Sequence, residues 1–312
     1  MNPKRIIPSI YTSDGQFSQT ESRQFVLDYN DAMARAFLLQ EQGADEIILI
    51  DVTTIAEKRR NLNRFLKDLS KNLSIPFTFG GGIHSVHVVA DILKLGVKKV
   101  YVNSAAVRDP SLINRITSDY GNESLMVAID AKQTFGTWKV FLNGGKSRTE
   151  IDLLNWIEIS QVRGASEILV STISRNSTES QDIIDILSKV RAICDVPLLA
   201  SVGARNDEDF INTFQQTGVD GIVSGHFFMT AQHTIVGLKN SLRNAGIQVS
   251  ENLNIPQVEL EEEPENEEIN EEIREEEPRT SAKKGGFLSN LLNRKEKEKP
   301  SPSEPLEDEE II

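Results

Sequence analysis

An internal repeat spans the first 250 residues of this sequence, and no other feature constrains the fold as strongly. Three segments recur 121 or 122 positions later, and the clearest is Gly43–Thr54 (GADEIILIDVTT), which resembles Gly164–Arg175 (GASEILVSTISR). The other two pairs are Ile75–Ile83 with Val196–Ala204 and Leu95–Val102 with Thr217–Ser224. Because both halves would contain the same elements in the same order, we expect this part of the chain to fold as two equivalent halves.

Each half alternates short apolar runs with longer stretches of helical pattern. Apolar residues recur every three or four positions in stretches such as 32–42 and 151–162, which predicts helices. Several of these stretches end at a glycine, as helix C-termini often do. The apolar runs predict eight strands: Arg5–Ile10, Glu46–Asp51, Pro76–Phe79, Lys99–Val102, Leu125–Asp130, Glu167–Ser171, Pro197–Ala200 and Gly221–Val223.

This alternation predicts an α/β fold. Strands rich in Val, Ile and Leu between helices indicate a parallel sheet that helices cover. Eight strand–helix units in about 250 residues match the size of a (β/α)8 TIM barrel. A doubly wound open sheet is the alternative, but the half-length repeat favours one closed barrel built of two half-barrels.

The composition changes at Ser250. From there to the end are 20 acidic and 8 basic residues, a net charge of −12, whereas residues 1–249 have a net charge of −1. We therefore expect a barrel over residues 1–249 and a charged, disordered tail over residues 250–312. Within the tail, Phe287–Leu292 is an apolar patch between basic clusters. It is either part of a solvated tail or a short helix that binds a protein partner or an anionic surface.

Several classes of protein are excluded. A nearly neutral barrel with an acidic tail argues against binding to nucleic acid. A lone cysteine, Cys194, excludes a disulfide framework and fits a reducing, cytoplasmic compartment. No run of about 18 apolar residues predicts a transmembrane segment, and the first ten residues lack the apolar stretch of a secretory signal. We expect no metal site and no cofactor.

Small polar residues and glycines follow four of the predicted strands, at the carboxyl ends where barrel enzymes place their sites. Glycine lets backbone N–H groups approach a ligand, and a following helix N-terminus favours an anion. The first phosphate segment comprises Gly81, Gly82, Asn103 and Ser104, and the repeat supplies a second with Gly203 and Ser224. Two such segments on opposite sides of the barrel mouth suit a small molecule with a phosphate at each end.

Asp130 ends the fifth predicted strand, so its carboxylate would stand at the mouth. A carboxylate in this position can act as a general acid or base. The alternative is a helix N-cap or an ordinary loop carboxylate. Asp51, at the end of the second predicted strand, allows the same two interpretations.

Six segments resemble the cyclase subunit of imidazole glycerol phosphate synthase, the HisF-type family of histidine biosynthesis. They are RIIPS, QGADEI, GGGIHS, VNSAAV, VAIDAK and the loop Asn143–Thr149 (NGGKSRT). The resemblance covers residues 1 to about 248, while the tail has no counterpart. It implies a heterodimer with a HisH-type glutaminase on the floor of the barrel. Ammonia would cross the barrel core to the mouth, where a bis-phosphate, nucleotide-like substrate is cleaved and cyclised.

At the mouth, the sequence departs from this family. Asp130 matches one essential aspartate, but Tyr11 takes the place of the other, and Gln19 replaces a substrate-contacting lysine. Ser174 and Asn176 stand where the family has two further carboxylates. The second phosphate segment differs as well, with Val202 in place of a glycine and His226 at a serine position.

These replacements predict an impaired cyclase. A tyrosine with a pKa of about 10 is a poor base at neutral pH. Losing one member of an acid–base pair costs a factor of about 10²–10⁴ in rate.

The floor, by contrast, retains the family pattern. The family closes the ammonia entrance with an arginine, two glutamates and a lysine, which Arg5, Glu46, Lys99 and Glu167 match at the starts of strands. Such a ring is either an ammonia gate or a structural plug.

A retained gate beside an altered mouth favours a barrel that receives ammonia from a HisH-type glutaminase and conducts it to another acceptor. Relatives of this pair are associated with amidotransfer to activated sugars of bacterial surface polysaccharides. One alternative is a genuine cyclase that uses Asp130 with a changed partner residue. The other is a non-catalytic scaffold barrel whose tail recruits partners.

Overall fold

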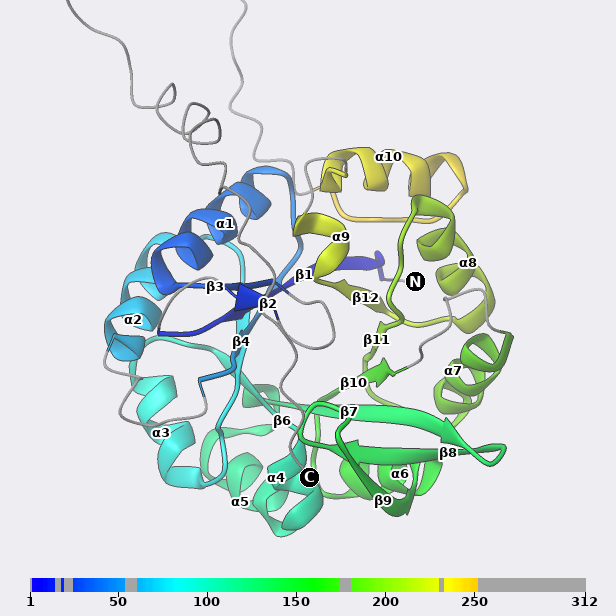
Figure 1. The fold of residues 1–312 in the computed structure, drawn as a ribbon, viewed down its shortest axis with the longest axis horizontal. Helices are drawn as coiled ribbons and strands as arrows, with labels where there is room; N and C mark the ends of the chain where they lie inside the picture. Colours follow the sequence, from blue (N-terminus) through cyan, green and yellow to red (C-terminus); the bar gives the residue numbers. More distant parts are fainter. Residues whose placement is uncertain are drawn as a thin grey trace, which may run out of the picture. The chain divides into compact units, whose positions relative to one another are not determined.

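Eight parallel strands pair in a closed ring in the computed structural model, which describes residues 2–14, 18–19, 25–53, 61–173, 181–229 and 233–251 (Figure 1). In ring order they are β1 (Arg5–Thr12), β4 (Ile47–Asp51), β5 (Phe77–Gly80), β6 (Lys99–Val102), β7 (Leu125–Thr134), β10 (Glu167–Thr172), β11 (Leu198–Ser201) and β12 (Gly221–Ser224). Parallel pairing of β12 with β1, where Gly221 lies opposite Arg5, closes the ring. The predicted (β/α)8 barrel is confirmed, and the open-sheet alternative is wrong.

Helices surround the strands in Figure 1. They are α1 (Tyr29–Glu41), α2 (Leu62–Asn72), α3 (Val86–Lys94), α4 (Ser104–Arg108), α5 (Ser111–Tyr120), α6 (Leu153–Val162), α7 (Gln181–Ile193), α8 (Asp207–Thr217), α9 (His226–Met229) and α10 (Ile235–Asn244). Ser85, Asn206 and Thr234 cap α3, α8 and α10, because each side chain accepts a hydrogen bond from a backbone N–H of the first turn. None of the helices in the described ranges is long and apolar enough to cross a membrane.

Side chains alternate along each strand, so one row faces the barrel interior and the other faces the helices. The interior row forms an apolar cluster of Ile7, Ile48, Met126, Ala128, Leu169, Leu199 and Val223, against which Ile50 and Tyr101 pack. The outer row forms the larger core with the helices. The interior cluster therefore separates the floor, at the amino ends of the strands, from the mouth, at their carboxyl ends.

A β-extension on β7 was not predicted. After Asp130, β7 continues to Thr134 and turns back into β8 (Thr137–Leu142), which pairs in turn with β9 (Ser147–Asp152). The predicted loop 143–149 therefore includes the start of β9, and the predicted helix 151–162 begins only at Leu153. Its N-cap is Asp152, which accepts a hydrogen bond from Leu154 N at 3.0 Å. The mostly polar sequence of β9 has no apolar run from which a strand could be predicted, and only the pairing with β8 defines it.

A second short hairpin joins β2 (Ser18–Gln19) to β3 (Phe25–Leu27), which pairs with β1.

A buried lysine fastens the last described residues to the barrel. Lys239 in α10 is 1% exposed, and its Nζ donates to Gly43 O at 2.7 Å, Asp45 Oδ1 at 2.8 Å and Ser250 Oγ at 2.7 Å. Burial lowers the pKa of Lys239, and the contact with Asp45 opposes this shift. Asp45 Oδ2 also accepts from Ile6 N at 2.7 Å. The contacts of the barrel thus reach Ser250, while residues 252–312, which include the apolar patch Phe287–Leu292, lie outside the described ranges.

The Ser250 contact predicts which C-terminal changes affect stability. Ser250→Ala is expected to lower the melting temperature by several degrees, because losing a hydrogen bond to a charged group costs about 1.5–3 kcal/mol. Truncation after Glu251 retains the contact and should leave the melting temperature nearly unchanged, since an acidic tail buries little apolar area. Thermal unfolding of the two variants beside the full chain checks this. A truncated chain that melts several degrees lower would instead indicate that the tail packs on the barrel.

Candidate functional site

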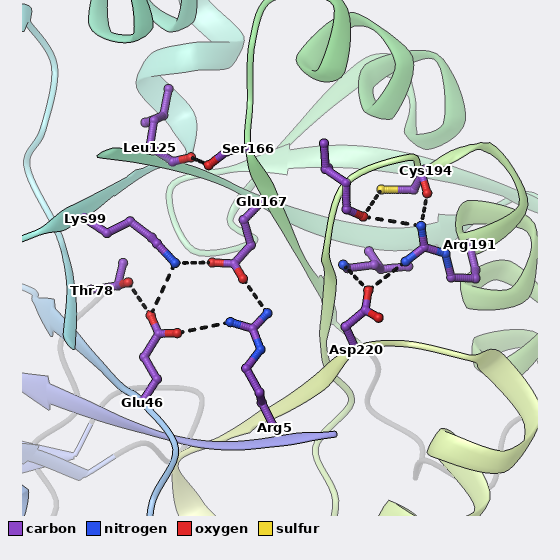
Figure 2. A network of polar contacts seen from close by, with 12 residues as sticks. Arg5, Glu46, Thr78, Lys99, Leu125, Ser166, Glu167, Arg191, Cys194 and Asp220 are labelled. Carbon is purple, nitrogen blue, oxygen red and sulfur yellow. Dashed lines mark hydrogen bonds and ion pairs between the residues drawn. The ribbon is translucent and has the colours of Figure 1, made fainter. Parts of the chain in front are cut away.

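Four charged side chains close the floor of the barrel (Figure 2). Arg5 and Lys99 begin β1 and β6, Glu167 begins β10, and Glu46 directly precedes β4. Arg5 Nη1 lies 3.3 Å from Glu46 Oε2, and Arg5 Nη2 lies 2.5 Å from Glu167 Oε1. Lys99 Nζ lies 2.8 Å from Glu167 Oε2 and 3.8 Å from Glu46 Oε1. Each cation therefore contacts both carboxylates, and we call this set the floor ring.

Burial within the floor ring is unequal. The side chains of Glu46 and Glu167 are 5% and 4% exposed, whereas those of Arg5 and Lys99 are 28% and 23% exposed. Burial raises the pKa of Glu46, aided by the charge of Glu167, and outweighs the cations and the hydrogen bond from Thr78 Oγ1 (2.5 Å). Burial alone would lower the pKa of Arg5, but Glu167 and then Glu46 raise it above its usual value. Removing one partner of such a buried set leaves an uncompensated charge, at a cost of about 3–5 kcal/mol.

A pocket of about 460 Å³ opens beside the floor ring. Its lining includes Glu46, Thr78 and Lys99, together with Phe77 on β5 and Tyr120 at the end of α5. The ring therefore borders a depression on the floor face, and a small polar molecule at this end would meet it directly.

Two tyrosines face the barrel interior above the floor ring, and Tyr101, two residues beyond Lys99, starts lower in the barrel than Tyr11, six residues beyond Arg5. Tyr11 on β1 lies opposite Ile50 on β4, Ile50 lies opposite Gly80 on β5, and Gly80 lies opposite Tyr101 on β6. The Tyr101 ring covers Gly80 so closely that a Cβ at that position would fall 1.9 Å from Tyr101 Cε1. The missing side chain at Gly80 thus gives the Tyr101 ring its space.

Sequence analysis missed Tyr101, although the signal was present. Lys99 was expected to face the interior as part of the floor ring, and side chains two positions apart on a strand face the same way. Tyr101 therefore had to point inward as well. It lies one interior position above Lys99, where it packs against the apolar interior cluster.

Asp130 lies on β7, four residues beyond Met126, which pairs with Tyr101. Burial raises its pKa from 3.8 to about 6, against a smaller lowering by the hydrogen bond from Asn103. Burial, then the nearby Tyr11 and Asp130, raise the pKa of Tyr101 well above its usual value. Tyr101 therefore lies within electrostatic range of both Tyr11 and Asp130, and we call these three residues the mouth cluster. A carboxyl group with a pKa near 6 can gain or lose a proton close to neutral pH.

The raised pKa of Asp130 predicts how stability depends on pH. Asp130→Asn is expected to stabilise the protein at pH 8 by about 2–3 kcal/mol, because the ionised carboxylate is less favourable in the folded than in the unfolded chain. The contribution of Asp130 to stability is greatest below its unfolded pKa of 3.8 and falls as the pH rises to about 6. The advantage of the variant should therefore shrink towards pH 4.5. Urea unfolding of both proteins at pH 4.5 and 8 measures it, and equal stability at pH 8 would contradict the shift.

The predicted phosphate segments follow β5 and β6 on one side of the barrel and β11 and β12 on the other. In the first, Gly81 has a φ of +107°, and a Cβ there would fall 2.0 Å from Asp51 O, so only glycine fits. Ser104 Oγ accepts a hydrogen bond from Asn143 N at 2.8 Å, which places the β8–β9 turn against this segment. The side chain of Asn103 directs its amide towards Asp130.

The second segment is less enclosed around its glycine. Gly203 has a φ of +70°, and among the described residues, its two chain neighbours aside, no atom lies within 4 Å of where its Cβ would be. Ser224 is buried at the end of β12, opposite Pro8. A phosphate-binding role for either segment stays a prediction.

The remaining candidates divide into two kinds. Asp51 Oδ1 accepts a hydrogen bond from Thr53 N at 2.9 Å, and its strand row faces the helices, so it organises its own loop. Ser174, Asn176 and the side chain of Gln19 lie outside the described residues. The structure therefore gives positions for the floor ring, the mouth cluster and both phosphate segments, but not for those three replacements.

Known proteins resemble this chain over almost the whole barrel. The family described as Histidine biosynthesis protein matches residues 5–234. The chain is 37% identical over 249 residues to the imidazole glycerol phosphate synthase subunit HisF of Flavobacterium psychrophilum, covering 80% of this chain and 99% of that protein. It is 35% identical over 250 residues to the subunit HisF of Flavobacterium johnsoniae and 34% identical over 250 residues to that of Streptococcus mutans. These matches cover 80% of this chain and 99% and 100% of the two relatives.

Proposed function

This chain belongs to the histidine biosynthesis protein family, with HisF subunits among its relatives, and from that premise we propose that it is a HisF-type subunit that conducts ammonia. It binds a HisH-type glutaminase at the floor, receives ammonia through the floor ring and delivers it at the mouth. The observation that carries this proposal is the closed set of ion pairs among Arg5, Glu46, Lys99 and Glu167. All four residues match the ammonia entrance that the family resemblance implies.

The chemistry of the ring is compatible with such an entrance. Its four charges cancel, and the two carboxylates offer acceptors to an N–H donor, while the neighbouring pocket gives access from the floor. Above the ring, the interior is lined by apolar side chains. An apolar passage favours neutral ammonia over ammonium, because moving a bare charge into it costs far more than moving a neutral molecule.

The mouth supports an acceptor other than the cyclase substrate. Tyr11 offers a phenol where the family has a catalytic carboxylate, and the Tyr101 ring fills the interior space over Gly80. Asp130 alone remains of the acid–base pair. We therefore propose that cyclase chemistry is impaired and that the ammonia serves amidotransfer, with activated sugars of surface polysaccharides as the acceptor class that the resemblance suggests.

A genuine cyclase is the second candidate, and a specific observation favours it. Asp130 has a pKa near 6, suited to acid–base work, and Gly81, Gly82, Asn103 and Ser104 are all present in the first phosphate segment. A cyclase of this kind would use Asp130 with a changed partner residue.

Co-purification with the cognate glutaminase, followed by assay of glutamine hydrolysis, tests the proposal. We expect a stable heterodimer in which this chain stimulates glutamine hydrolysis. Glu46→Lys reverses one charge of the floor ring and should disrupt complex formation. Asp130→Asn changes a residue at the mouth and should leave complex formation intact. Failure of the wild-type chain to bind the glutaminase would contradict the proposal and favour a scaffold role.

A further inference from the structure

The barrel interior is closely filled above the floor ring. On the four strands that carry the ring, the next inward-facing side chains are those two residues further along: Ile7, Ile48, Tyr101 and Leu169. Three other strands add Met126, Leu199 and Val223 to the same cluster. We call these seven side chains the interior layer. A molecule admitted at the floor must cross this layer to reach the mouth.

One strand brings no side chain to the interior layer. On β5, Gly80 stands two residues beyond Thr78, whose hydroxyl group donates to Glu46 at the floor. The Tyr101 ring occupies the space that Gly80 leaves, because a Cβ at Gly80 would overlap three of its carbon atoms, Cδ1, Cε1 and Cζ. Gly80 and Tyr101 also lie opposite each other in the strand register. The Tyr101 ring therefore covers the place in the layer where the strand's own side chain is missing.

Tyr101 is enclosed less completely than its neighbours. Part of its surface is exposed, whereas Met126, its register partner on β7, and Ile48 are both 0% exposed. Rotamer changes are fast for side chains with exposed surface, while a fully enclosed side chain moves only if its neighbours make room. Tyr101 is therefore the member of this group that can leave its place without a rearrangement of the strands.

The same two strands lead from the floor pocket towards the mouth. Thr78 on β5 and Lys99 on β6 line the pocket of about 460 Å³. Gly80 and Tyr101 follow two residues later on these strands, and Asn103 directly follows β6 at the mouth. A molecule that travels along β5 and β6 passes Lys99 first and the Tyr101 ring next.

We propose that Tyr101 controls passage through the barrel interior. Its ring closes the gap over Gly80, and a small neutral molecule crosses along β5 when the ring moves aside. The apolar side chains of the interior layer exclude ions, because burying a bare charge costs far more than burying a neutral molecule. That ammonia takes this route rests on the proposed function, whereas the closure of the interior by Tyr101 does not.

Oxidation of Met126 by hydrogen peroxide, in the full chain without glutaminase, tests the closure. Peroxide is a small neutral molecule, and it converts a methionine that it reaches to the sulfoxide. Met33 in α1 is partly exposed and packs against the outer core, so it serves as the reference within the same molecule. Mass spectrometry of the two peptides gives the initial rate at each methionine.

Tyr101→Ala is expected to speed the oxidation of Met126 at least about tenfold, because the ring no longer shields the sulfur atom. Tyr101→Phe keeps the ring and should stay within about twofold of the wild type. Leu199→Ala is the matched control, since it removes a large side chain from the same layer but leaves the gap over Gly80 covered. It should also stay within about twofold of the wild type.

Low concentrations of urea separate movement of the ring from unfolding. Urea raises the population of the unfolded chain steeply, but it has little effect on an opening that exposes little surface. Oxidation of Met126 in the wild type should therefore be unchanged up to about 1 M urea. A rate that rises in parallel with the unfolded fraction would overturn the proposal, because peroxide would then reach the sulfur atom only through unfolding.

Equal rates at Met126 in the wild type and Tyr101→Ala would also overturn the proposal, as would equal acceleration by Tyr101→Ala and Leu199→Ala. A variant that is merely unfolded would be oxidised faster at Met33 as well, and melting curves identify it. Tyr101→Leu keeps an apolar side chain in the layer but no ring, so it gives the same comparison with less loss of packing. Because the assay contains no glutaminase, its failure leaves ammonia conduction by another route standing, and a failure to bind glutaminase leaves the closure standing.

Discussion

Supplied with ammonium salts and the bis-phosphate substrate of the family, the purified chain is expected to cyclise it at least about 10²-fold more slowly than the HisF subunit of Flavobacterium psychrophilum. The reason is Tyr11, whose phenol has a pKa of about 10 in its ordinary state and cannot replace a carboxylate as a base near pH 7. Asp130 remains, but a single carboxyl group cannot serve as both members of an acid–base pair. Imidazole product formed per active site under saturating substrate measures the difference.

Two substitutions of Tyr11 test whether this residue is the cause of the low turnover. Tyr11→Asp restores the family's carboxylate and should raise turnover, though not to the level of the relative, because Ser174 and Asn176 replace two further carboxylates. Tyr11→Phe, which removes only the hydroxyl group, should leave turnover as low as in the wild type. Wild-type turnover close to that of the Flavobacterium subunit would mean that the cyclase is intact.

Lys99→Leu is expected to reduce glutamine-driven amination of the acceptor by about 10- to 100-fold while sparing amination driven by ammonium salt added at the mouth. Without Lys99, two buried carboxylates face the single cation of Arg5, so the floor ring must rearrange and its geometry changes. Small displacements along a reaction path can cost up to about 10²-fold in rate. The two nitrogen sources, assayed on the same reconstituted complex, measure the difference.

Lys98 offers the matched control for this substitution. Its side chain lines the same pocket and is exposed, but it takes no part in the floor ring, so Lys98→Leu should leave both rates unchanged. Melting curves are needed because breaking a buried ion pair costs about 3–5 kcal/mol. A merely weakened fold would lower both rates together. Equal losses with the two nitrogen sources, or no loss with either, would remove the basis for an ammonia entrance at the floor.

The barrel could be predicted because its main signals are local or repeated. Each strand of the ring is a short apolar run, and the recurrence of Gly43–Thr54 at Gly164–Arg175 links the halves without any knowledge of contacts. The β8–β9 extension could not be predicted in this way. Its strands are defined by antiparallel pairing with β7, and the polar sequence of β9 has no apolar run to signal it.

Some site residues, like the strands, could be predicted from sequence patterns, whereas others depend on how the strands are arranged in three dimensions. Positions at the starts and ends of strands were enough to place Arg5 at the floor and Asp130 at the mouth. The approach of Tyr101 to Tyr11 and Asp130, and the space over Gly80 that admits the Tyr101 ring, depend on how neighbouring strands are staggered. Stagger around a closed barrel is a property of the whole sheet, so no single segment encodes it.

The central claim is that this barrel takes up ammonia from a glutaminase without using it for cyclisation. The ratio of cyclised product formed to glutamine hydrolysed tests it directly, in one reaction containing this chain, its cognate glutaminase, glutamine and the family's bis-phosphate substrate. Our account predicts that glutamine is hydrolysed by the complex and that the ratio lies at or below about 0.01, as the loss of one acid–base partner requires. A ratio close to one would contradict it and identify the chain as a working cyclase.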